Sequence, residues 1–197
     1  MQTGLKERIA QMQQKLSSRH PVAEIHADSQ LFVSPEPVCD RLVALADIRP
    51  GDRVLEPNAG TGAILRAILA AQPAARCECV EVNYALVRHL QSAFPGVPVN
   101  CSDFLSYQPA EPFDRIIMNP PFRHAADLKH IRHALTMLAP DGCLVAVCTT
   151  GPRQQRALRE IAVHHEELPR GTFSYTDVST MIVRINAPDT AIQLLNQ

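Results

Sequence analysis

Several features that would define a specialised protein are missing from this 197-residue chain. Its formal net charge is −1, so it lacks the excess positive charge expected of a protein that holds nucleic acid over a large surface. No hydrophobic run approaches the length needed to cross a bilayer, and there are no repeats or low-complexity segments. With 46% hydrophobic and 20% charged residues, the sequence is typical of a globular protein, and we expect it to be cytoplasmic.

A metal-binding cysteine pattern is also absent. Cys77 and Cys79 are the only close pair among six cysteines, and no second pair follows at the spacing of a metal site. Period-2 geometry places both on one face of a single strand. We therefore expect no metal site, and cysteines that serve as small core residues in a reducing compartment.

The N-terminal segment differs from the rest of the chain. Apolar residues recur at helical spacing from Leu5 to Leu16 in an otherwise polar stretch. This pattern predicts a helical and extended extension over residues 1–30, followed by one domain over 31–197. The helix either covers the main domain or serves as a homodimer contact, and the pattern leaves both open.

Strand-like and helix-like segments alternate from residue 34 onward. Ser34-Pro35 predicts a helix start, with Ser34 as N-cap and Pro35 as the first helical residue. The predicted helices are 38–46, 63–71, 84–94, 125–138 and 153–165, and the predicted strands are 53–57, 76–82, 97–101, 115–119 and 143–150. We expect Pro140-Asp141-Gly142 to end the fourth helix.

This alternation predicts an α/β fold with a doubly wound, mostly parallel sheet. Residues 166–186 contain two β-rich runs without a helix between them, so we expect an antiparallel hairpin at one sheet edge. Ligands of such sheets bind at the carboxyl ends of the strands.

A glycine-containing loop, Glu56-Pro57-Asn58-Ala59-Gly60-Thr61-Gly62, joins a predicted strand to a predicted helix. Its glycines permit a tight turn and a close approach of a ligand to the backbone. The loop lacks the Gly-Lys-Ser/Thr ending of a P-loop, and the strand before it ends in an acid. An acidic pocket suits a cationic ligand, and S-adenosylmethionine carries a sulfonium and an ammonium group.

Acids follow the next two strands. Glu81 lies 19 residues after Gly62, where a carboxylate can accept hydrogen bonds from both ribose hydroxyls. Asp103 ends the third strand, where it can accept from the adenine amino group while Phe104 covers the ring.

The string Asn119-Pro120-Pro121-Phe122 follows another strand. Consecutive prolines fix the backbone and leave the Pro120 carbonyl free to accept a hydrogen bond, and Asn119 adds a side-chain oxygen. Two acceptors can hold the N–H bonds of a planar amino group and draw its nitrogen toward tetrahedral geometry, so no strong base is required. Phe122 offers a flat face for stacking.

These two motifs resemble the amino-methyltransferase branch of the class I S-adenosylmethionine-dependent methyltransferases, with a Rossmann-like seven-stranded sheet. Small phage- or plasmid-type adenine-N6 DNA methyltransferases are similar in motif order and in a Phe32-Val33-Ser34-Pro35 segment. The resemblance implies Asn119, Pro120, Pro121 and Phe122 as catalytic residues. The cofactor-binding residues that it implies are Phe32, Ser34, Pro35, Glu56, Pro57, Asn58, Ala59, Gly60, Gly62, Glu81, Val82, Asp103, Phe104 and Asn119.

The resemblance favours methylation of adenine N6, in DNA more than in RNA. Residues 1–30 are too short for a target-recognition domain, so we expect a flipped or single-stranded target base rather than strict duplex specificity. The alternatives are a guanine amino group, a protein glutamine amide, or an inactive cofactor-binding regulatory or anti-restriction protein. Basic residues that either bind nucleic acid or form a solvated face are Arg123, His124, Lys129, His130, Arg132, His133, Arg153, Arg156 and Arg159.

Overall fold

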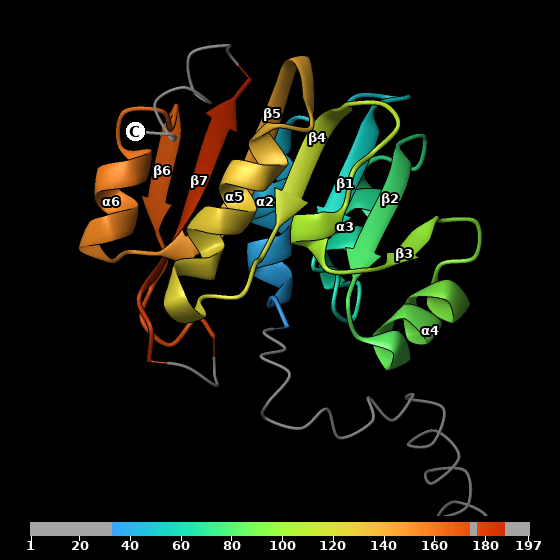
Figure 1. Cartoon of the computed structure of the whole chain (residues 1–197), viewed down its shortest axis with the longest axis horizontal. Helices are drawn as coiled ribbons and strands as arrows, with labels where there is room; N and C mark the ends of the chain where they lie inside the picture. Colours follow the sequence, from blue (N-terminus) through green and yellow to red (C-terminus); the bar gives the residue numbers. More distant parts are fainter. Residues whose placement is uncertain (1–32, 174–176, 188–197) are drawn as a thin grey trace, which may run out of the picture. The chain divides into compact units, whose positions relative to one another are not determined.

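The structure is a computed structural model that describes residues 33–173 and 177–187. The predicted extension over residues 1–30, the homodimer contact assigned to it and Phe32 lie outside the described residues. The described chain builds one seven-stranded sheet of order β3-β2-β1-β4-β5-β7-β6 (Figure 1). The predicted fold class, a mostly parallel Rossmann-like sheet with an antiparallel edge hairpin, is confirmed.

Five parallel strands form the main part of the sheet. They are β1 (Arg53–Pro57), β2 (Arg76–Glu81), β3 (Val99–Cys101), β4 (Phe113–Met118) and β5 (Leu138–Thr149). β1 pairs with β2 on one side and with β4 on the other, so the chain changes direction across the sheet at β1. In parallel sheets, ligands bind at the carboxyl ends of the strands beside such a point.

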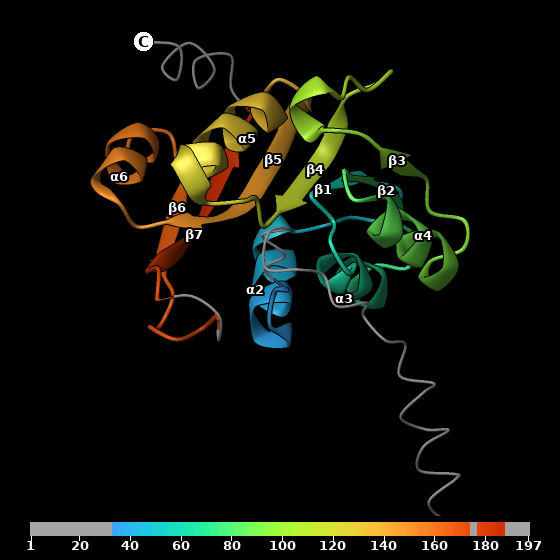
Figure 2. The same ribbon diagram turned by 60° about the horizontal axis from the view of Figure 1, so that its bottom comes forward.

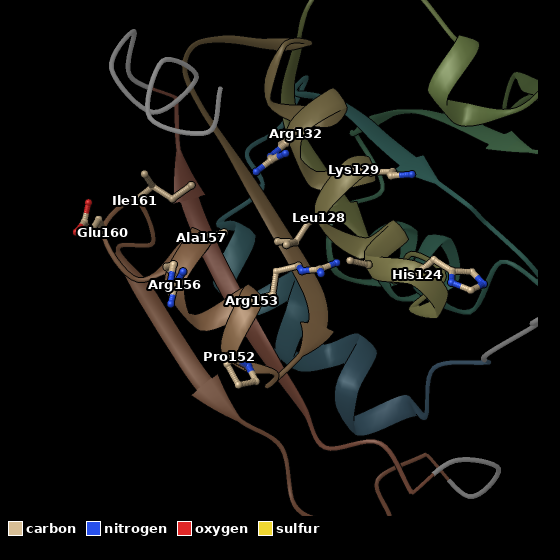
Figure 3. A pocket seen from close by; sticks show the side chains of 11 residues that line it. His124, Leu128, Lys129, Arg132, Pro152, Arg153, Arg156, Ala157, Glu160 and Ile161 are labelled. Carbon is tan, nitrogen blue, oxygen red and sulfur yellow. The ribbon is translucent and has the colours of Figure 1, made fainter. Parts of the chain in front are cut away.

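Helices cover both faces of the sheet. On one face lie α2 (Glu36–Ala46), α3 (Ala63–Ala71) and α4 (Tyr84–Ala93), and on the other lie α5 (Ala126–Leu135) and α6 (Pro152–Leu158), as Figure 2 shows. Two short turns of 3₁₀ helix, η2 (Phe104–Ser106) and η3 (Arg123–Ala125), precede β4 and α5. α5 and α6 border a groove that Figure 3 shows from close by.

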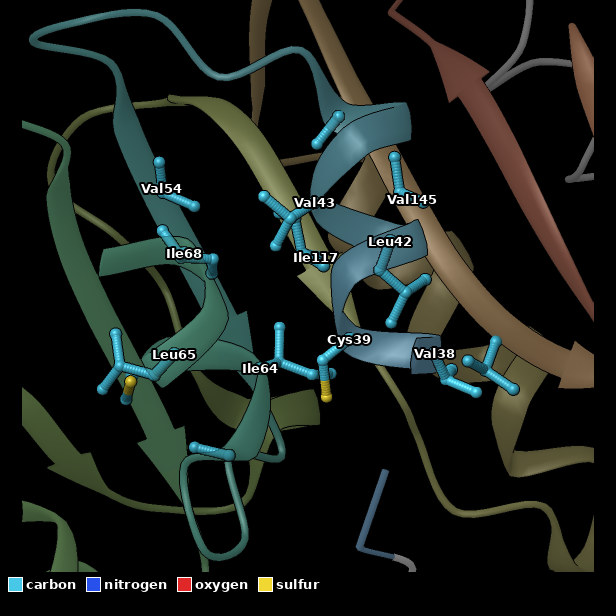
Figure 4. Close-up of a cluster of buried hydrophobic side chains, with 14 of the residues drawn as sticks. Val38, Cys39, Leu42, Val43, Val54, Ile64, Leu65, Ile68, Ile117 and Val145 are labelled. Carbon is cyan, nitrogen blue, oxygen red and sulfur yellow. The ribbon is translucent and has the colours of Figure 1, made fainter. Parts of the chain in front are cut away.

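Two hydrophobic cores result from the alternation of side chains along the buried strands. In β5, Cys143, Val145 and Val147 belong to the core under α2 and α3 (Figure 4), and Leu144 and Ala146 belong to the core under α5. The two predicted same-face cysteines, at positions 77 and 79, both lie in the first core. Both faces of the central strands are therefore buried in hydrophobic cores.

Two predicted helix ends are wrong. The helix predicted to end at Pro140-Asp141-Gly142 ends at Leu135, and these three residues lie within β5 beside a register irregularity. Gly142 suits this place because a Cβ there would lie 2.9 Å from a backbone oxygen of Ala139. The backbone can bend at this point and continue as a β-strand. Residues whose pattern is typical of a helix end therefore lie within β5.

The helix predicted over 153–165 is also too long. α6 ends at Leu158, and β6 (His164–Glu167) pairs antiparallel with β7 (Thr180–Asn186). β7 in turn pairs antiparallel with β5, so the predicted hairpin at the sheet edge is confirmed. Pairing with β7 outweighs the helical preference of the segment. Among the described residues, none of the helices has the length and hydropathy required to span a membrane.

Candidate cofactor and acceptor site

The loops after β1, β2 and β4 meet at one edge of the sheet, because the three strands are parallel neighbours. The β1–α3 loop carries three left-handed residues, Asn58 (φ 61°), Gly60 (φ 55°) and Gly62 (φ 75°). At Gly62 a Cβ would lie 2.5 Å from the Phe94 ring, so only glycine fits. Helix α4 therefore packs directly against the turn of the loop.

Glu81 joins the first two loops. One carboxylate oxygen accepts from the Gly60 backbone N–H at 2.8 Å and the other from the Asn83 N–H at 2.8 Å. The side chain is only 7% exposed. A carboxylate oxygen can accept more than one hydrogen bond, so this position keeps acceptor capacity for ribose hydroxyls, and that role stays a prediction.

Glu56 is the buried acid of the site. It is 2% exposed, and among the described residues its Oε2 has no hydrogen-bond partner. Burial raises the pKa of the Glu56 carboxyl well above its ordinary value, a hydrogen bond from the Leu65 backbone lowers it, and the nearby Glu81 raises it. A buried acceptor without a partner is costly. A cationic ligand such as S-adenosylmethionine, with its ammonium group, fits this donor-poor environment.

The acceptor motif is held by the segment before α2. The Asn119 side-chain nitrogen donates to the Ser34 hydroxyl at 3.0 Å, and Ser34 is 6% exposed. Ser34 was predicted to be an N-cap, and this is wrong. Pro35 occupies the cap position of α2 and has no side-chain group that could cap the helix. The Ser34 hydroxyl, one residue earlier, accepts from Asn119 instead. This contact fixes the orientation of the asparagine amide.

The end of the motif is more buried than the sequence suggested. Phe122 is 9% exposed, and its ring meets Phe173 edge to face at 6.4 Å between centroids. Stacking on a planar acceptor stays a prediction, since it requires access that this packing restricts. After Arg123, the consecutive residues His124 and Ala125 both have φ 55°. Consecutive left-handed residues without glycine are strained and gather at functional sites.

The predicted adenine contacts are only partly brought together. Val82 is 67% exposed directly after Glu81. Asp103 accepts from the Leu105 backbone N–H at 3.0 Å and so caps η2. Phe104 is 1% exposed and packs against histidine rings of α5, so the structure turns its ring into the core. The adenine roles of these residues stay predictions.

One contact in the site escaped the sequence analysis. His130 of α5 places its Nδ1 2.8 Å from the Asn58 side-chain oxygen, 72 residues away in sequence. Burial lowers the pKa of His130 to about 4, so the ring is neutral near pH 7 and donates its Nδ1 proton to the amide. In the sequence His130 lies in a basic run, but the helical period of the apolar residues on α5 puts it on the buried face.

Comparisons with known proteins identify the family and the fold. A family model described as "Methyltransferase small domain" matches residues 40–174. "Ribosomal RNA small subunit methyltransferase A" of Parasynechococcus marenigrum is 42% identical over 69 residues, which cover 35% of this chain and 22% of that protein. The chain thus matches less than a quarter of that relative's length.

Solved structures share the fold. The 23S rRNA methyltransferase ErmE superposes with a TM-score of 0.61 at 20% identity, covering 80% of this chain and 70% of ErmE. Coclaurine N-methyltransferase, in a complex with N-methylheliamine and SAH, superposes with a TM-score of 0.63 at 14% identity, covering 76% of this chain and 72% of that one.

Proposed function

Because this chain belongs to the methyltransferase small domain family, we propose that it transfers a methyl group from S-adenosylmethionine to N6 of adenine in a nucleic acid. The observation that carries the proposal is the Asn119–Ser34 contact at the end of β4. It holds the Asn119 side-chain amide in place, at the sheet edge where the glycine loop also lies, and Pro120 is the next residue in the chain.

S-adenosylmethionine is the cofactor. It supplies a methyl group on a positively charged sulfur, which is open to attack by a nitrogen lone pair. We assign its ammonium group to the buried carboxyl of Glu56 and its ribose hydroxyls to Glu81. We assign the left-handed turn from Asn58 to Gly62 as the backbone segment against which the ligand lies.

Asn119 and Pro120 perform the chemical positioning. Their two oxygens accept hydrogen bonds from the two N–H groups of the amino group. These contacts favour a tetrahedral nitrogen, whose lone pair is no longer delocalised into the ring and is therefore nucleophilic. The Ser34 contact engages the asparagine nitrogen, and we assign the side-chain oxygen to the amino group. No side chain needs to remove a proton before the attack.

We propose RNA as the polymer. The curated relative is named a ribosomal RNA methyltransferase, and this name favours RNA over the DNA preference expected from the sequence. A base in a loop or an unpaired segment of RNA is accessible without a separate domain to extract it.

The test measures methyl transfer from labelled S-adenosylmethionine to separate pools of RNA, single-stranded DNA, duplex DNA and protein. Nucleoside mass spectrometry identifies the product. We expect N6-methyladenine in the RNA pool, and a loss of at least about 100-fold in rate for Asn119→Ala, since oriented polar contacts of this kind contribute about 10²–10³.

Asn186→Ala is the matched control, because Asn186 lies exposed at the opposite edge of the sheet, at the end of β7. It should keep the wild-type rate. Label in a guanine amino group or in glutamine, or cofactor binding without any Asn119-dependent label, would contradict the proposal.

A further inference from the structure

A basic groove lies between α5 and α6 (Figure 3). Its volume is about 640 Å³, which is in the range of pockets that hold whole organic ligands rather than a single small ion. We call it the α5–α6 groove. Its ionisable lining residues are His124, Lys129, Arg132, Arg153, Arg156 and Glu160.

The charge of the groove contrasts with that of the chain. Four permanent cations and one acid line it, although the whole chain carries a net charge of −1. Within residues 33–173 and 177–187, none of these four cations forms an ion pair or a side-chain hydrogen bond with the protein. The groove is therefore positively charged, and its cations are available to an external anion.

The cations are arranged in two rows. Lys129 and Arg132 are three residues apart on α5, and Arg153 and Arg156 are three apart on α6, so each pair lies on one face of its helix. Figure 3 shows Arg132 and Arg153 extending from the two helices toward the space between them. Repeated cations along a channel match an anion with repeated charges better than a single phosphate.

The two helices are fastened to each other beneath the groove. Asp127 of α5 is fully buried and accepts from the Gln154 side-chain nitrogen of α6 at 3.0 Å. It also accepts from the Thr149 backbone N–H at 3.1 Å and hydroxyl at 3.2 Å, at the end of β5, and from the Leu128 backbone N–H at 2.9 Å. The shape of the groove is thus built into the fold, so little ordering is needed when a ligand binds.

The groove begins beside the acceptor site. His124 lies two residues after Phe122, and Pro152 follows the carboxyl end of β5. Both are at the sheet edge that carries Asn119. One end of the groove therefore lies at the sheet edge that carries the acceptor motif.

We propose that the α5–α6 groove binds the sugar-phosphate backbone of the single-stranded RNA segment that carries the target adenine. The inference rests on the proposed function, because it assigns the path of that substrate. Arg153 and Arg156 on α6, with Lys129 and Arg132 on α5, pair with phosphates on either side of the strand.

The test compares binding of a short fluorescent single-stranded RNA to the wild type and to the double variant Arg153→Glu/Arg156→Glu, over a series of salt concentrations. We expect the Kd to rise by at least roughly tenfold, and the slope of log K against log salt to fall by about 1.4, because each phosphate contact on a single strand contributes about 0.7. Thermal melting and S-adenosylmethionine binding should stay as in the wild type.

The matched control reverses two charges elsewhere. Arg49 precedes β1 and Arg88 lies on α4, across the sheet from the groove, and both are exposed. Arg49→Glu/Arg88→Glu should keep the wild-type Kd and salt slope. An equal loss of binding in this control would overturn the proposal, because it would show a response to net charge alone.

Asn119→Ala separates this inference from the proposed function. It should lower the methylation rate by at least about 100-fold and leave the salt slope of RNA binding unchanged, because Asn119 is assigned to the base and not to a phosphate. If the wild type binds RNA and Arg153→Glu/Arg156→Glu binds it with the same Kd and salt slope, the assignment of the groove to RNA is wrong and the proposed function stands. Failure of the wild type to methylate or bind any nucleic acid overturns both, and a groove-dependent preference for an acidic protein or for DNA overturns the choice of RNA.

Discussion

Residue 62 has to be glycine, because an added methyl group would destabilise the turn of the β1–α3 loop. Gly62→Ala would place a Cβ 2.5 Å from Phe94 at a φ of 75°, so steric overlap and backbone strain act together. We expect a loss of about 1–3 kcal/mol in the free energy of unfolding, measured by urea denaturation.

Gly96→Ala supplies the comparison for that variant. Gly96 has φ 94°, but a Cβ at this position would have no atom within 4 Å. The free energy of unfolding of this variant should fall only by the energy of the backbone strain, about 1 kcal/mol. Equal losses in the two variants would show that packing of α4 against the loop contributes nothing.

The buried carboxyl of Glu56 gives the cofactor-free protein a characteristic pH dependence. Its pKa is raised in the folded state, so the folded protein binds this proton more tightly than the unfolded chain does. The stability that the protonated form contributes is fully present below the unfolded-state pKa of about 4.3, and it is lost as the pH rises toward the folded-state value.

Glu56→Gln should remove this contribution. We expect the variant to lose less stability than the wild type between pH 5 and pH 8 in the absence of cofactor, as measured by denaturant unfolding. Its Kd for S-adenosylmethionine should rise about 10- to 100-fold, because a charged hydrogen bond contributes about 1.5–3 kcal/mol. Glu160→Gln, at an exposed acid, serves as the control, and an identical pH profile in Glu56→Gln and wild type would refute the assignment.

At the scale of the elements, the Asp127–Gln154 contact holds α5 against α6. Gln154→Ala removes one donor from a fully buried carboxylate, and we expect a loss of about 1.5–3 kcal/mol in the free energy of unfolding. Gln155→Ala changes the same residue type one position later, where the side chain is exposed, and it should leave stability unchanged. Calorimetric melting of both variants distinguishes the loss of the buried contact from the small effect of alanine on helix propensity.

The boundaries of these elements show where sequence patterns reach their limit. The strands and helices from residue 53 to residue 94 are local patterns, and the predicted helix 63–71 coincides with α3. The segment 159–165 is different, because its structure depends on pairing with β7, whose strand lies beyond it in the chain. Long-range pairing of this kind has no local signal, so the helix was predicted too long.

On the scale of the whole molecule, the sequence identified the loops that surround the site but not their cross-contacts. Glu56, Glu81 and Asn119 are recognisable because each ends an apolar strand, and the fold brings those ends to one edge. The Ser34–Asn119 and Asn58–His130 contacts join residues 85 and 72 positions apart. Only tertiary packing brings such pairs together.

The two outer strands of the sheet bear on how the protein behaves at high concentration. β3 has three residues, and β6 has four, His164-His165-Glu166-Glu167, with Glu166 bound to Arg41 at 2.6 Å. Long, flat, apolar edges are the ones that recruit strands from other molecules, whereas short and charged edges resist this. Both described margins of the sheet are therefore poor templates for amyloid-like growth.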